Sequence, residues 1–182
     1  MSKVITFSKT FPAYHPKAGK PTYFVEKIWK SLWDQNKAHD IHLYQEPHDE
    51  FFHPMGANDM RNVHQFKAKH HTIRGGNRWK EGDYFSPRVW SGKPYNSKQI
   101  QFAPDIKIER VYDFTIDPLK TGDIYLNGWY VFMDRYSNIL NVHEIANNDG
   151  LSKEDMLAWF KHPKPFIGQI IVWDPKIIYK HG

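Results

Sequence analysis

The sequence predicts an α+β fold, in which a small mixed or antiparallel β-barrel is decorated by several helices. After residue 67, short runs rich in β-branched and aromatic residues follow one another, and turn residues separate them. Helical patterns lie both before and after these runs, and no segment repeats or is low in complexity. A chain of 182 residues is long enough for one core, so we expect one domain over residues 1–182.

The composition is that of an ordinary globular chain. Hydrophobic residues make up 40% and charged residues 25%, and cysteine is absent, which fits a reducing compartment. The N-terminal segment has no long apolar stretch, and no window approaches the roughly 20 apolar residues of a membrane span. We therefore expect a cytoplasmic protein that makes no contact with membranes.

The first third of the chain predicts one strand and one long helix. Residues 4–7 (VITF) form the strand, and the three prolines of residues 11–22 predict irregular structure. Thr22 is a candidate cap for an amphipathic helix over 22–35. The apolar side of this helix has three- and four-residue spacing: Phe24, Val25, Ile28, Trp29, Leu32 and Trp33.

Residues 36–66 are polar and have no sustained period. We interpret about 12–66 as an inserted helix and loop excursion, since long loops are often functional. The histidines of this region are His39, His42, His48, His53 and His64. Their spacing matches no zinc signature, so we predict no metal site, and no phosphate-binding or dinucleotide motif suggests a cofactor.

The middle of the chain reads as β-structure. Residues 70–74 alternate, and 83–90 (DYFSPRVW) contain a proline that predicts an edge strand. Residues 100–117 form a long alternating run. Residues 123–134 contain Asn127-Gly128, a tight-turn signal.

Two short helices and a final strand pair are expected at the C-terminal end. Residues 142–149 form the first helix. In the second, Ser152 is the cap, Asp155 occupies the capping-box position and Pro163 ends the helix. Residues 165–179 are rich in apolar and β-branched residues and predict the strand pair.

Positive charge is concentrated in one segment. Residues 61–98 hold nine Lys or Arg against two acidic residues, a net charge of +7, and the rest of the chain has a net charge of −2. Aromatic residues are interleaved with these charges: Trp79, Tyr84, Phe85, Trp90 and Tyr95. The combination favours a polyanion with stackable bases, although a solvated basic surface is the alternative.

The stretch KAKHHTIRGGNRWKEGD, residues 67–83, is the densest part of this segment. Alternation on a regular strand places Lys69 and Thr72 on opposite faces, so a bulge or a strand end is needed to bring them together. Gly75-Gly76 ends the strand where the backbone turns or approaches a ligand.

These residues resemble the ASCH domains, a branch of the PUA-like superfamily. The shared features are ITFSKTF (5–11), KHHTIR (69–74) followed by RWKEGD (78–83), NNDGLSKEDMLAWF (147–160) and GQIIVWD (168–174). They occur in the family's order and cover most of the chain. The resemblance implies a PUA-like β-barrel with a cleft for RNA or a modified nucleoside.

The resemblance also implies a possible activity. Small bacterial ASCH proteins include amidohydrolases that remove the acetyl group from N4-acetylcytidine, in which Lys is thought to activate Thr as the nucleophile and Glu assists. By position these catalytic residues are Lys69, Thr72 and Asp149, so an aspartate stands where the family has a glutamate. A threonine hydroxyl needs a base beside it, and a lysine is a base only if burial or nearby cations lower its pKa.

Three functions remain open from the sequence. The first is RNA or modified-nucleoside binding, the second is amide hydrolysis on an acylated nucleoside, and a ribonuclease with His or Lys as base is a third. The binding candidates are Arg74, Arg78, Lys67, His71, Tyr95 and Arg88. Each residue also has a plainer interpretation: Thr72 as a strand residue, Lys69 as an edge-strand charge, Asp149 as a helix-entry residue and Trp79 as core.

Overall fold

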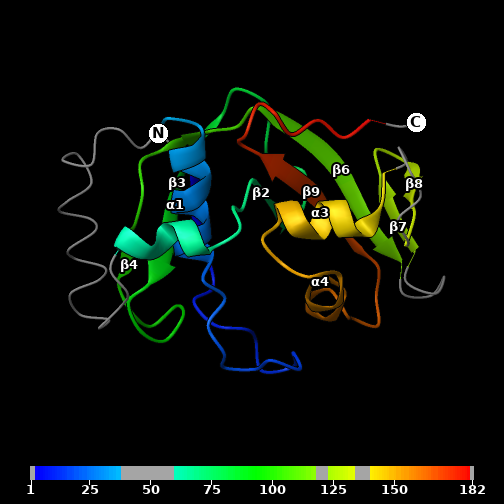
Figure 1. Ribbon diagram of the computed structural model, residues 1–182. Helices are drawn as coiled ribbons and strands as arrows, with labels where there is room; N and C mark the ends of the chain where they lie inside the picture. Colours follow the sequence, from blue (N-terminus) through cyan, green and yellow to red (C-terminus); the bar gives the residue numbers. More distant parts are fainter. Residues whose placement is uncertain (1–2, 38–59, 118–122, 134–139, 181–182) are drawn as a thin grey trace. The chain divides into compact units, whose positions relative to one another are not determined.

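The computed structural model describes residues 3–37, 60–117, 123–133 and 140–180 (Figure 1). Their fold is α+β, with two sheets and, within these ranges, three α-helices. The chain divides into two compact units. Unit 1 comprises Met1–Ala13, Lys17–Ala68 and Asp83–Lys107; unit 2 comprises Tyr14–Pro16, Lys69–Gly82 and Ile108–Gly182.

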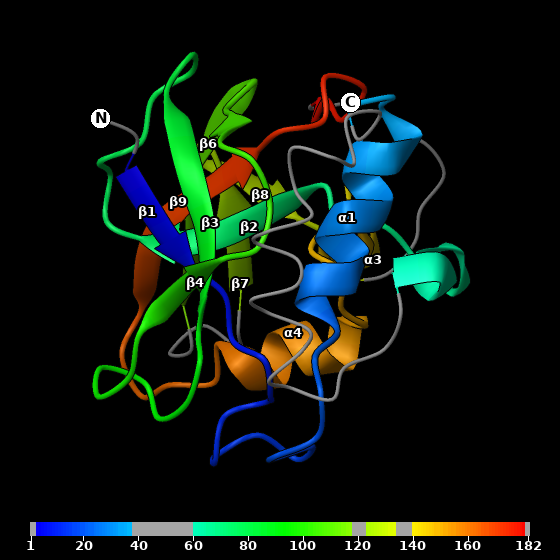
Figure 2. The same ribbon diagram turned by 90° about the vertical axis from the view of Figure 1, so that its left-hand side faces the viewer.

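Unit 1 contains a small mixed sheet in the order β1-β3-β4, with β5 also paired to β3. Its elements are β1 (Lys3–Thr6), α1 (Phe24–Asp34), the 3-10 helix η2 (Met60–Gln65), β3 (Tyr84–Trp90), β4 (Gln99–Gln101) and β5 (Ile106–Lys107). β1 runs parallel to β3, beside it in Figure 2, whereas β4 and β5 are antiparallel to β3.

The prediction that residues 83–90 form an edge strand is wrong. β3 lies between β1 and β4, and Pro87 is in register with Ile5. The Pro87 carbonyl accepts a hydrogen bond from the Phe102 backbone N–H at 3.2 Å. The proline therefore joins the ladder as an acceptor, and its missing N–H does not exclude it from an inner strand.

The α1 helix is amphipathic as predicted, and its buried side holds most of the apolar residues of the pattern. Its N-cap is Tyr23, in the left-handed region at φ 57°, and not Thr22. The Thr22 hydroxyl still accepts a hydrogen bond from the Phe24 N–H at 3.4 Å and donates one to the Ser8 carbonyl at 2.6 Å. The Trp29 indole N–H donates to the Phe102 carbonyl at 3.0 Å, which ties the helix to the segment after β4.

Unit 2 contains a fully antiparallel sheet in the order β2-β9-β6-β7-β8. Its elements are β2 (His71–Gly75), β6 (Arg110–Asp117), β7 (Asp123–Leu126), β8 (Trp129–Val131), α3 (Val142–Asn148), α4 (Lys153–Trp159) and β9 (Phe166–Val172). The Asn127-Gly128 turn is confirmed between β7 and β8, with φ values of 48° and 80°. The predicted Ser152 cap is also confirmed, since its side chain accepts from the Asp155 N–H.

Two other strand predictions need correction. Residues 100–117 are not one strand but contain the end of β4, β5 and β6, because the run is interrupted around Pro104 and again at Ile108 and Glu109. Residues 165–179 supply a single strand, β9, and not a pair. β9 pairs with both β2 and β6, so both of its partners come from elsewhere in the chain.

Figure 1 shows α3 and α4 beside the sheet of unit 2, and aromatic contacts join the end of α4 to this sheet. The Phe160 ring, at the end of α4, lies 6.1 Å from Phe114 of β6 and 4.8 Å from Phe166 of β9 between centroids. No helix among the described residues combines the length and apolar composition that crossing a bilayer requires.

Candidate functional site

The candidate site lies where the start of β2 meets the end of α3, both in unit 2. The His70 N–H donates to the Asn148 carbonyl at 2.7 Å, and the His70 carbonyl accepts from the Trp173 N–H at 3.2 Å. These two backbone bonds hold the residues before β2 between the last turn of α3 and the end of β9. They also fix the position of the backbone at the start of KHHTIR, from which its side chains extend.

Lys69 and Asp149 form a buried pair at this junction. The Lys69 Nζ donates to Asp149 Oδ1 at 2.5 Å and to the Asp149 carbonyl at 2.6 Å. The two side chains are only 1% and 7% exposed. Lys69 is therefore neither a solvated edge-strand charge nor a surface contact for phosphate, and Asp149 is long enough to make the contact despite having one methylene fewer than glutamate.

The pair has a structural use as well as a chemical one. Asp149 is the C-cap of α3, and Gly150 follows it in the left-handed region at φ 72°. A cation bonded to the last carbonyls of a helix interacts favourably with its dipole. Lys69 therefore stabilises this turn whatever else it does.

His71 extends the buried network on the other side of Asp149. Its Nε2 lies 3.7 Å from Asp149 Oδ1, and its Nδ1 lies 2.9 Å from the Tyr179 hydroxyl oxygen. The Asn148 amide N–H donates to the same hydroxyl at 3.0 Å. Because that oxygen already accepts from Asn148, its proton is best directed at His71 Nδ1, which leaves the His71 proton on Nε2, facing the carboxylate.

Burial keeps this histidine neutral. Burial is the main cause that lowers the pKa of His71 well below 6.5, and the positive charges of Lys69 and then His70 lower it further. Burial also raises the pKa of Tyr179 well above 10, so its hydroxyl keeps its proton. Both groups therefore act as neutral hydrogen-bonding groups near neutral pH.

Thr72 and Arg74 share the other face of β2. Thr72 is 3% exposed, and β2 alternation places Arg74 two residues further along the same face. Arg74 keeps part of its side chain exposed, but its Nε is inaccessible to solvent. Burial lowers the pKa of Arg74 to about 10, against the opposing effect of the Asp149 carboxylate, so the guanidinium stays charged.

Lys69 lies outside the regular part of β2, whereas Thr72 lies within it. β2 begins at His71, and the side chain of Lys69 is directed by the backbone bonds at His70 and not by strand alternation. Lys69 meets Asp149 just before β2, and β2 bears Thr72 and Arg74, so this part of unit 2 holds candidates for a base, a nucleophile and a stabilising cation.

The remaining candidates of unit 2 have other surroundings. Trp79 is core at 2% exposure, and its backbone N–H and C=O are both bonded to the Gln169 amide, at 3.0 and 3.3 Å. Arg78 is exposed and its guanidinium carbon lies 5.0 Å from the centroid of the Trp79 ring. Trp79 therefore supports the strand and offers no free face for stacking.

Three further candidates belong to unit 1. Lys67 is exposed, and the Arg88 Nε donates to the Ser86 hydroxyl at 3.1 Å. Tyr95 is 87% exposed at φ 65°, with its ring 5.4 Å from the Trp90 ring. These residues form no part of the buried cluster in unit 2.

Sequence reasoning missed the residues that complete the buried network. Tyr179 and Asn148 hold His71, and the Asp174 carboxylate lies 2.8 Å from His70 Nδ1. The only sequence signal was the NND run before Gly150, since Tyr179 and Asp174 are distant from His71 in the chain. A weakly patterned C-terminal segment gave no reason to single them out.

The structure contains no obvious metal site in the part that it describes, where no group of three or more His, Asp or Glu side chains has a suitable arrangement. Residues His39, His42, His48 and His53 lie outside the described ranges. In comparisons with known proteins, no family model, curated protein or solved structure matches the chain.

Proposed function

We propose that the chain is an ASCH-type protein with the β-barrel fold of the PUA-like superfamily, and that it hydrolyses an amide bond of an acylated nucleoside in the cytoplasm. The observation that carries the proposal is the contact of Lys69 Nζ with Asp149 Oδ1 at 2.5 Å, beside a strand that bears Thr72. The motif positions and this contact agree on Lys69 and Asp149, and the motif adds Thr72.

The burial of Lys69 favours hydrolysis over binding along an open groove. A lysine that is 1% exposed is poorly placed to neutralise phosphates of a nucleic acid, which are read by accessible cations. A base and a nucleophile in a water-poor site gain from the same burial, because electrostatic interactions are stronger there.

Each of these side chains has its own role in the proposed reaction. The Thr72 Oγ1 attacks the acyl carbonyl carbon, and its proton passes to the Lys69 amine in its neutral form, with Asp149 holding the proton that Lys69 has given up. The C–N bond breaks, the leaving amine takes a proton from Lys69, and Arg74 stabilises the oxyanion. Water then hydrolyses the Thr72 ester and releases the carboxylic acid.

The experiment is an incubation of the purified protein with N4-acetylcytidine, in which cytidine is followed by chromatography. We expect cytidine release, and we expect Thr72→Ala to reduce it to below about a thousandth, since loss of a nucleophile costs at least that much. Thr72→Ser keeps a hydroxyl and should retain part of the activity.

Matched controls separate chemistry from folding. Thr115→Ala removes a threonine from β6 of the same sheet, and Lys107→Ala removes an exposed strand lysine; both should leave activity unchanged. No release by the wild-type protein, or full release by Thr72→Ala, contradicts the proposal.

A second candidate function is nucleic-acid binding through exposed groups. Tyr95, at 87% exposure, and the exposed Lys67 and Arg78 support it, since stackable rings and accessible cations suit single-stranded RNA. The test is RNA binding as a function of salt, in which the affinity should fall as phosphate contacts are screened. An affinity that is independent of salt contradicts it.

A further inference from the structure

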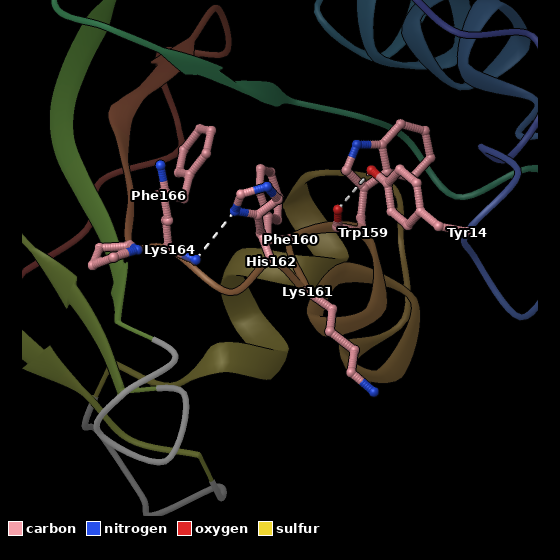
Figure 3. Close-up of a pocket in the computed structure, with 8 residues that line it drawn as sticks. Tyr14, Trp159, Phe160, Lys161, His162, Lys164 and Phe166 are labelled. Carbon is pink, nitrogen blue, oxygen red and sulfur yellow. Dashed lines mark hydrogen bonds between the residues drawn. The ribbon is translucent and has the colours of Figure 1, made fainter.

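A cavity in unit 2, separate from the Lys69–Asp149 pair, is lined by aromatic and basic residues. Its volume is about 620 Å³, within the usual range for small-molecule sites. It is lined by Tyr14, Trp159, Phe160, Lys161, His162, Lys164, Pro165 and Phe166 (Figure 3). Four of these residues are aromatic, three are basic and none is acidic. The proposed hydrolysis uses none of them.

The aromatic walls of the cavity are held in place by a hydrogen bond and by ring contacts. The Tyr14 hydroxyl donates to the Trp159 carbonyl at 2.9 Å, which fixes that ring against the end of α4. On the opposite side, the Phe160 and Phe166 rings lie 4.8 Å apart between centroids. All four aromatic residues line the cavity and keep part of their surface exposed.

The basic side chains come from one short, stiff loop. Pro163 and Pro165 restrict the backbone on either side of Lys164. The Lys164 backbone N–H donates to His162 Nδ1 at 3.2 Å, so His162 keeps its proton on Nε2 as a donor. In Figure 3, the Lys164 side chain rises beside Phe166, whereas Lys161 extends away from the rings and forms the rim.

We propose that this cavity binds a nucleotide, with the base against the aromatic walls and the phosphate at Lys164 and His162. Ring faces favour a planar base, and an all-basic polar lining favours an anion, so the two features together select a base that carries a phosphate. A loop stiffened by two prolines loses little conformational freedom on binding, which favours affinity. The inference does not depend on the proposed hydrolysis, because no residue is shared between the two sites.

The test is calorimetric titration of the full chain with AMP, adenosine and inorganic phosphate. We expect AMP to bind, and adenosine and phosphate alone each to bind at least about tenfold more weakly, because each lacks one of the two recognised parts. Lys164→Met should lower the affinity for AMP about tenfold and leave that for adenosine unchanged. Tyr14→Leu, at a side chain that is largely exposed, should weaken both.

Two control variants locate the binding. Lys176→Met removes an exposed lysine outside the cavity, and Thr72→Ala alters the proposed catalytic cluster; both should bind AMP as the wild type does. The inference is overturned if AMP does not bind, if AMP and adenosine bind equally, or if Lys164→Met and Tyr14→Leu have no effect. Loss of AMP binding in Thr72→Ala, with none in Lys164→Met, would place the nucleotide at the other site and also overturn it.

Discussion

Two stretches of the same basic segment end in opposite environments. Residues 69–74 lie in unit 2, where Lys69 is 1% exposed and paired with Asp149. The loop between β3 and β4 lies in unit 1 and presents Tyr95, which is 87% exposed. Charge clustering in the sequence is therefore no guide to burial. The two stretches differ in burial: Lys69 meets the Asp149 carboxylate at the C-cap of α3, whereas Lys93 is exposed.

The largest expected difference between the two regions is in stability. Lys69→Met leaves the Asp149 carboxylate buried without its cation, which should lower the free energy of unfolding by about 3–5 kcal/mol. Lys93→Met, in the exposed loop, should change it by less than about 0.5 kcal/mol. Chemical denaturation of the two variants and the wild type measures both values.

The double variant Lys69→Met, Asp149→Asn tests whether the loss of stability comes from the unpaired carboxylate. With no charge left to bury, part of the lost stability should return, so the two substitutions should not be additive. Equal effects of Lys69→Met and Lys93→Met would show that the buried pair is not formed in solution.

The next largest effect on stability is expected where β2 and β9 approach each other closely. A Cβ added at Gly168 would clash with the Arg74 backbone carbonyl oxygen and lie 2.8 Å from the Phe166 ring. Gly168→Ala should therefore destabilise the protein by about 1–3 kcal/mol, because backbone cannot move aside as a flexible side chain can. Thermal or chemical unfolding measures the loss.

Gly75→Ala is the matched control, since Gly75 is the register partner of Gly168 and a Cβ there meets only Phe166, at 3.8 Å. Its effect should be less than about 0.5 kcal/mol. A tolerated Gly168→Ala would mean that β2 and β9 lie further apart than described, and would weaken the account of how Arg74 is held.

The pH dependence of stability tests the neutral His71. Its pKa in the folded protein is depressed well below 6.5, so the unfolded chain binds the proton more readily. The stability that this difference contributes is present above pH 6.5 and is lost as the pH falls toward the folded-state pKa. The expected slope is about 1.4 kcal/mol per pH unit below the unfolded-state pKa.

Denaturation at several pH values between about 5 and 7 measures this slope. His71→Asn should remove the contribution of His71 to this slope. The groups that face His71 are Lys69, His70, Asp149 and Tyr179, and all four remain in that variant. A slope unaltered by His71→Asn would contradict the assignment.

Local patterns predicted the fold well where the interactions are local. The Ser152 cap, the Asn127-Gly128 turn and the buried side of α1 depend on neighbours within a few residues, and all three are confirmed. Pro87 and the segment after residue 165 were misread because strand position and pairing depend on distant partners. A proline that contributes only its carbonyl can lie inside a sheet, and nothing near it in the sequence says so.

At the candidate site, too, local sequence patterns could not predict contacts between distant residues. The motif positions of Lys69 and Asp149 predicted that they matter, but 80 residues separate them, and tertiary contacts such as the His70–Asn148 backbone bond bring them together. Tyr179 has no motif at all, since its role comes from where the C-terminal segment passes His71.

The smallest effect on stability is expected at Tyr95. A tyrosine at φ 65° is strained, and glycine relieves that strain but gains more freedom when unfolded, so Tyr95→Gly and Tyr95→Ala should each change stability by less than about 0.5 kcal/mol. If the loop recognises single-stranded RNA by stacking, both variants should nevertheless weaken binding of a short oligouridine by about 1–3 kcal/mol. Tyr84→Ala, also at an exposed ring of unit 1, should bind as the wild type does. Unchanged binding by Tyr95→Ala would leave the exposed loop without a recognition role, and the contrast between the two regions would then be one of burial alone.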